Sequence, residues 1–119
     1  MYFEDPIRQR LALHFEGGFI DISIGDGWLA LVDELDRRLT HLCGDQGYAL
    51  LQVKSKFGGL RYYSVFPKEV MHECQVLVEE AEKASFLICE GCGGPDPISV
   101  GWYALCAKCM KLREGGPEN

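Results

Sequence analysis

The apolar positions of this chain follow a helical period in three places. Asp5 and Pro6 form a typical helix start, and apolar residues recur at helical spacing over residues 7–15. The same spacing returns over residues 28–42 and over residues 70–88. We therefore expect three helices, the last two with charged outer faces.

Strand patterns fill the intervals between these helices. Residues 19–24 alternate apolar and polar side chains, and residues 48–57 and 60–66 are further predicted strands. Gly58-Gly59 is predicted to be the two-residue turn of a hairpin, which would place Lys56 opposite Arg61 and Lys54 opposite Tyr63. The core face of this hairpin would consist of Val53, Phe57, Leu60, Tyr62 and Phe66.

These elements predict an α+β fold in which three helices pack on a small sheet that contains the β-hairpin. Residues 1–88 would form the core domain. From residue 89 onward glycine, proline and cysteine dominate, which indicates a small zinc finger over residues 89–114, packed on the core. Residues 115–119 are expected to be a flexible tail.

The cysteine spacing carries the most specific chemistry in the sequence. Cys89 and Cys92 form one Cys-x2-Cys pair, Cys106 and Cys109 form another, and thirteen residues separate the pairs. Four thiolates at this spacing suit structural Zn²⁺, in a zinc-ribbon or treble-clef-like finger whose closed coordination sphere excludes a catalytic role. We favour this interpretation over a disulfide framework or a thioredoxin-like redox pair.

The other two cysteines, Cys43 and Cys74, stand on apolar helix faces and are expected to be buried. The histidines, His14, His41 and His72, are expected at the surface or at helix ends. Asp33, Glu34, Asp36, Arg37 and Arg38 are expected on the solvated side of the second helix.

Charge is distributed in blocks within a total of −6. Residues 49–68 contain four basic residues and no acidic one, whereas both flanking segments are acidic. The predicted hairpin face with Lys54, Lys56, Arg61 and Tyr63 is our candidate partner-binding surface. Two explanations stay open: neighbouring acids of the third helix could neutralise these cations, or the cations could bind an anionic ligand.

Other patterns argue against catalysis and membrane insertion. No nucleophile elbow or Walker motif is present, and Gly25-x-Gly27 is better explained as a glycine turn than as a dinucleotide fingerprint. No segment approaches the roughly 20 apolar residues that a membrane-spanning helix needs. The N-terminus lacks a signal-peptide pattern, so we expect a cytoplasmic protein. Because no catalytic motif is recognised, we also expect that it is not an enzyme.

Two segments resemble a group of small bacterial and phage proteins of uncharacterised function. The first is Lys56-Phe57-Gly58-Gly59-Leu60-Arg61 with its neighbours, and the second is the paired Cys-x2-Cys region including Gly101-Trp102. The segment Gly27-Trp28-x-x-Leu31 is similar as well. The resemblance implies a bacterial or phage cytoplasmic origin and a zinc finger, but no activity.

We therefore expect a non-enzymatic zinc-binding interaction protein. Its small size and net acidity favour an immunity or inhibitor protein that neutralises a bacterial toxin by binding it. The alternative is a nucleic-acid-associated accessory protein that uses the basic hairpin and the zinc finger. Neither a membrane nor a small-molecule substrate is expected as a partner.

Overall fold

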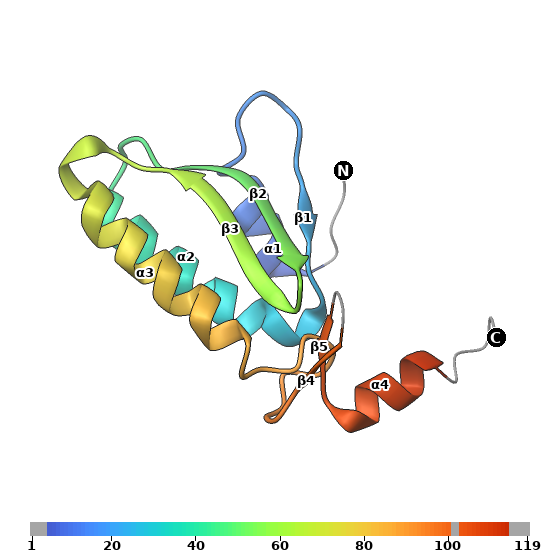
Figure 1. Cartoon of the computed structure of the whole chain (residues 1–119). Helices are drawn as coiled ribbons and strands as arrows, with labels where there is room; N and C mark the ends of the chain where they lie inside the picture. Colours follow the sequence, from blue (N-terminus) through green and yellow to red (C-terminus); the bar gives the residue numbers. More distant parts are fainter. Residues whose placement is uncertain (1–4, 101–102, 115–119) are drawn as a thin grey trace.

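Helices and short strands alternate along the chain (Figure 1). The computed structural model describes residues 5–100 and 103–114. Its helices are α1 (Pro6–Ala12), α2 (Leu29–Cys43), α3 (Met71–Ser85) and α4 (Ala107–Glu114). Its strands are β1 (Ile22–Ser23), β2 (Ala49–Lys56), β3 (Gly59–Val65), β4 (Ile98–Val100) and β5 (Tyr103–Leu105). The 3₁₀ turns η1 (Asp26–Trp28) and η2 (Lys68–Val70) lead into α2 and α3.

The predicted α+β class is confirmed, but the predicted number of helices is wrong. The described residues contain four helices, because the segment that follows Cys106 and includes Cys109 folds into α4. This helix belongs to the cysteine-rich region and not to the layer that packs on the sheet (Figure 1). The predicted tail, residues 115–119, lies outside the described residues.

The first helix begins as its sequence predicts and ends earlier than expected. The Asp5 carboxylate accepts the backbone N–H of Arg8 at 2.7 Å, and Pro6 occupies the first turn. The helix ends at Ala12. Phe15, which the periodicity assigned to the helix, instead forms an isolated parallel bridge with Leu50.

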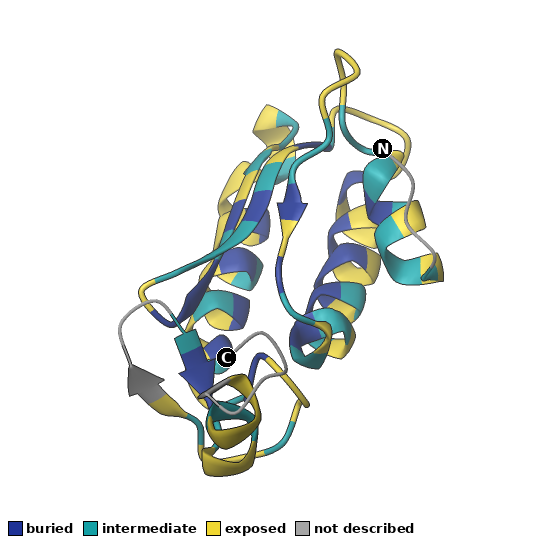
Figure 2. Ribbon diagram, turned by 90° about the vertical axis from the view of Figure 1, so that its right-hand side faces the viewer, coloured by how far each residue is buried: buried dark blue, intermediate teal, exposed yellow. Residues whose placement is uncertain are grey.

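The main sheet has the strand order β1-β2-β3. The first two strands run parallel and are connected through α2, whereas β2 and β3 form the predicted antiparallel hairpin. Figures 1 and 2 show α2 and α3 side by side against one face of this sheet. Within the described residues, no helix covers the opposite face.

The core lies between this sheet and the helices. Its largest fully buried apolar side chains come from α1, η1, α2 and both hairpin strands, which explains the helical and alternating patterns in the sequence. They are Trp28, Leu11, Leu39, Leu50, Leu60, Val32 and Val53.

The hairpin turn lies one residue earlier than predicted. Phe57 and Gly58 are the turn residues, with φ values of 54° and 79°, and Lys56 pairs with Gly59. A Cβ on Gly59 would lie 2.4 Å from the ring of Phe86, so this glycine is needed inside the strand rather than in the turn. Phe57 is consequently 55% exposed and does not join the core face.

The free edge of β3 is covered by side chains of α3. The backbone N–H of Tyr62 donates to a Glu82 carboxylate oxygen at 3.0 Å, and the N–H of Leu60 donates to Ser85 Oγ at 2.8 Å. These two edge donors are thereby satisfied inside the molecule. Glu82, expected on the solvated face of the third helix, is therefore partly buried.

Asp36 was also expected to face solvent, and its side chain is buried instead. Its carboxylate accepts hydrogen bonds from Arg10 Nε at 2.9 Å and from the Tyr48 hydroxyl at 2.8 Å, and His14 Nε2 lies 3.1 Å away. Burial alone would raise the pKa of Asp36, but these partners outweigh it and lower the pKa. His14 is correspondingly half-buried, whereas His41 and His72 are exposed as expected.

Cys43 and Cys74 are both buried, as expected, with their sulfurs 3.6 Å apart as free thiols. Burial, together with the hydrogen bond to Cys43, raises the pKa of Cys74 to about 12. Among the described helices, none has the length and apolar character to cross a membrane.

Candidate metal centre

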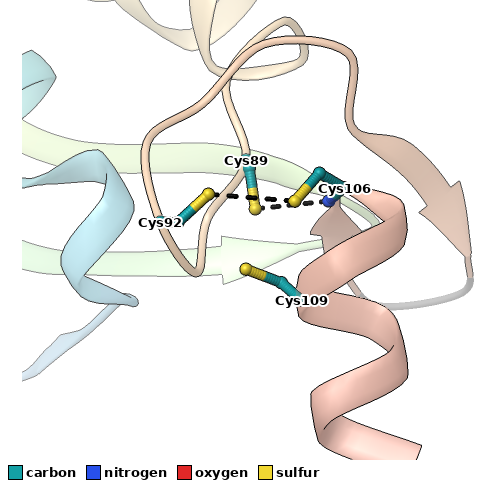
Figure 3. A group of neighbouring side chains, drawn as sticks. All are labelled: Cys89, Cys92, Cys106 and Cys109. Atoms are coloured by element: carbon teal, nitrogen blue, oxygen red, sulfur yellow. Dashed lines mark hydrogen bonds between the residues drawn. The ribbon is translucent and has the colours of Figure 1, made fainter.

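Four cysteine sulfurs converge at one point beside the hairpin tip (Figure 3). The sulfurs of Cys89, Cys92, Cys106 and Cys109 all lie within 4.8 Å of one another. Cys92 Sγ and Cys106 Sγ are 3.8 Å apart, which is about the edge of a thiolate tetrahedron around Zn²⁺ with Zn–S bonds of about 2.3 Å. All four are free thiols, so the predicted ligands form a site that could hold one metal ion.

Each cysteine pair is positioned by local backbone structure. Cys89 and Cys92 stand in a tight loop, closed by hydrogen bonds from Gly93 N to the Cys89 carbonyl and from Cys89 N to the Gly94 carbonyl, each 2.8 Å. Cys106 directly precedes α4, and Cys109 follows in the first turn of that helix. The antiparallel pair β4–β5 connects the two ligand pairs.

This order of loop, hairpin and helix is that of a treble-clef-like finger, one of the two forms expected from the sequence. Gly101 and Trp102 lie outside the described residues. Four thiolates fill a tetrahedral site and leave no position for a substrate or a reactive water. The geometry therefore favours a structural role for a bound metal.

The pKa values of two of the four thiols are shifted in opposite directions. Burial opposes charge on Cys89, but backbone N–H groups, including that of Cys106 at 3.2 Å, lower its pKa to about 6. The hydrogen bond to Cys89 raises the pKa of Cys109 to about 12. Without a metal, Cys89 thus favours the thiolate and Cys109 the neutral thiol, and a bound divalent cation would favour the thiolate form of both.

Glu90, which the sequence reasoning missed, connects the metal loop to the core. It is only 6% exposed. Its carboxylate accepts hydrogen bonds from Ser55 Oγ at 2.8 Å and from the Gly25 N–H at 2.9 Å. Its carbonyl oxygen accepts the Gly27 N–H at 2.8 Å. The ligand loop is therefore bound both to β2 and to the turn before α2.

Close backbone packing explains the Gly25-x-Gly27 pattern. A Cβ on Gly27 would lie 2.2 Å from the carbonyl oxygen of Cys89, so only glycine allows this approach. Next to it, the buried indole of Trp28 donates to the carbonyl of Ile88 at 2.9 Å. The glycine turn expected from the sequence thus forms the docking surface for the finger.

The four candidate partner-binding residues lie apart from the metal ligands, on the β2–β3 hairpin. Lys54 pairs directly with Arg61, and Lys54 Nζ lies 6.0 Å from the centre of the Tyr63 ring. These side chains alternate with the buried Val53 and Tyr62, so they face away from α2 and α3. The predicted pairings of Lys56 with Arg61 and of Lys54 with Tyr63 are both wrong, because the earlier turn shifts the register, but the four residues still share one face.

Within the described residues, no ion pair involves Lys54, Lys56 or Arg61. The carboxylate beside this face, that of Asp21, accepts a hydrogen bond from Gln52 instead. The third helix packs on the other side of the sheet, where Glu82 binds backbone instead. Exposed apolar side chains adjoin the cations: Leu51, at the irregularity in the β2–β3 pairing, is 58% exposed, and Val65 is 47% exposed.

The described residues thus offer two candidate functional features: a four-cysteine site that fits a metal ion, and a sheet face that combines cations outside any ion pair with exposed apolar groups. Sequence spacing indicated the first, and strand alternation indicated the second. Glu90 gave no sequence signal, because its contacts come from segments far apart in the chain. Comparison of the chain with protein-family models, with curated proteins and with solved structures gives no match.

Proposed function

We propose that this chain is a non-enzymatic binding protein, stabilised by structural Zn²⁺, that holds a protein partner against the open face of its β2–β3 hairpin. The observation that carries the proposal is the unpaired charge of Lys54, Lys56 and Arg61 beside Tyr63. Directly opposed cations repel each other, so this face costs folding energy that an anionic partner would recover.

The composition of the face favours a protein partner over a nucleic acid. Leu51 and Val65 add exposed aliphatic area next to the cations, and Tyr63 is 42% exposed between them. Aromatic residues and arginine surrounded by apolar area are typical of interface hot spots. The net charge of −6 opposes the approach of a long polyanion.

The specific partner that we propose is a bacterial toxin, which this protein would inhibit by binding, in the cytoplasm, as an immunity protein does. Support comes from the small size of the chain and from the resemblance described above. Complementarity requires that the toxin present carboxylates and apolar side chains to the hairpin face.

A nucleic-acid-associated role is the second candidate. Tyr63 next to unpaired cations also suits a single strand, whose bases stack on aromatic rings while its phosphates contact lysine and arginine. Such binding would weaken steeply with added salt because counterions are released.

The test uses the full metal-loaded chain and the purified product of the gene that precedes its own. We expect a complex in biolayer interferometry that weakens by about tenfold or more in the double variant Lys54→Glu/Arg61→Glu. Lys83→Glu is the matched control, because Lys83 is an exposed cation on α3, away from the hairpin face. It should bind as the wild type does.

Two outcomes would overturn the proposal. One is equal loss of binding in Lys83→Glu, which would mean that net charge alone matters. The other is salt-dependent binding of a single-stranded DNA oligonucleotide, lost in the hairpin variant, with no binding of the upstream gene product. That result would establish the second candidate instead.

A further inference from the structure

The outward side of the α2–α3 pair, facing away from the sheet, carries a continuous groove. A hollow of about 580 Å³ lies between the two helices near the end where Cys43 and Cys74 meet. A smaller hollow of about 200 Å³ continues toward the other end. Arg38 and Leu77 line both hollows, so the two form one groove.

The charge of this groove changes sign along its length. One end is lined by Arg37, Arg38, His41 and His72, with Glu73 as its acidic member. The other end is lined by Glu34 and Glu80, with Arg38 at the boundary. Both helices line both ends. With histidine neutral, the arginines of the first end outnumber Glu73, and the two glutamates of the second end outnumber Arg38, so the groove has a weakly basic half and a weakly acidic half.

Several charges that line the groove form no ion pair in the part of the chain that the structure describes. Arg37 is engaged by Asp33 at 3.3 Å. Among the described residues, Arg38, Glu34 and Glu80 form no ion pair, and all three are exposed.

Apolar side chains accompany these unpaired charges. Leu42 is 36% exposed and Val76 is 39% exposed, although both line a concave surface. Leu31 and Leu77 continue the apolar floor toward the acidic half. The floor thus offers apolar area to bury along the whole groove.

We propose that this groove is the interface of a homodimer. A two-fold axis that passes between Arg38 and Glu80, which line the same hollow from α2 and α3, lays each helix of one copy over the other helix of its mate, so the surface complements itself. Arg38 of each copy then faces Glu80 of its mate. The two helix pairs pack as a four-helix layer, the usual arrangement for side-by-side helices.

The size of the groove surface sets the expected affinity of the homodimer. Each helix has 15 residues and is about 22 Å long, so the buried area lies at the low end for specific interfaces. We therefore expect dissociation constants in the range of about 1–100 µM. The sheet face that we propose for the partner lies on the opposite side of the helices, so either proposal can fail without the other.

Sedimentation equilibrium of the metal-loaded chain from about 5 to about 500 µM tests the dimer. Wild-type protein should pass from monomer to dimer over this range. Arg38→Glu places acid against acid at both contacts, and Glu80→Arg places base against base, so each variant alone should dimerise at least about tenfold more weakly. An equimolar mixture of the two variants restores both opposite-charge contacts and should form heterodimers about as strongly as wild type.

Glu79→Arg is the matched control, because Glu79 precedes Glu80 but lines a different hollow, beside Tyr62 and Phe66. It should dimerise as the wild type does. A wild-type chain that stays monomeric throughout overturns the proposal. So does a dimer that neither Arg38→Glu nor Glu80→Arg weakens, or a mixture of the two variants that stays monomeric.

Discussion

The helix-and-sheet core and the cysteine finger are held together by different means. Fully buried leucine, valine and tryptophan side chains from most of its elements stabilise the core. The described part of the finger contributes few buried residues: Cys89, Glu90, Ala104 and Leu105. Apolar burial therefore suffices for the first region, whereas the second depends on its metal ligands and on the contacts of Glu90 with the core.

Metal removal should have the largest effect: it should unfold the finger and leave the core folded. Structural zinc sites contribute about 10–16 kcal/mol to the folding of small fingers, so chelation, or the Cys106→Ser substitution, should unfold residues 89–114. The core should persist because its apolar side chains remain buried. Hydrogen exchange by mass spectrometry should show lost protection in α4 and β5 and retained protection in α2 and β2.

Cys74→Ala serves as the control for this experiment, because it removes a buried thiol that is no metal ligand. It should retain about one equivalent of metal per chain. Full protection of residues 89–114 without metal would show that the finger does not depend on a metal for its fold.

Truncation of a core side chain should have the next largest effect. It should destabilise the core and leave the metal site intact. Leu39 on α2 is fully buried, so Leu39→Ala should lower the free energy of unfolding by about 2–5 kcal/mol, measured by urea denaturation. Metal content should stay unchanged. Leu112→Ala on α4, where the side chain is 66% exposed, should change stability by less than about 0.5 kcal/mol.

Acid should affect the finger before the core. Metal binding requires deprotonated thiols, so falling pH should release the metal first. The pKa of Asp36 is lowered in the fold, so its contribution is complete above the unfolded value of about 4 and is lost as pH falls through the folded pKa. A pH titration that follows metal release and circular dichroism together should show two separate steps.

Asp36→Asn should lower stability at neutral pH by about 1–3 kcal/mol, because hydrogen bonds to a charged group are lost. It should also flatten the acid dependence of the core step while leaving the metal step in place. An unchanged core step would show that Asp36 does not govern it.

Sequence reasoning succeeded where local pattern determines structure. Helical periodicity located α2 and α3, and the Cys-x2-Cys spacing identified the four cysteines that converge at the candidate metal site. It failed where distant segments meet. Asp36 is buried because Arg10 and Tyr48 reach it from other elements, and the hairpin turn shifts because Phe86 occupies the space beside Gly59.

The covered edge of β3 limits how any partner can attach. A peptide that adds a fourth strand to a sheet must receive hydrogen bonds from the edge backbone. Here the N–H groups of Leu60 and Tyr62 already donate to Ser85 and Glu82. Strand addition at β3 is therefore blocked, together with the edge-to-edge aggregation that open strands invite. A partner that approaches this edge must therefore be recognised by side chains rather than by backbone pairing.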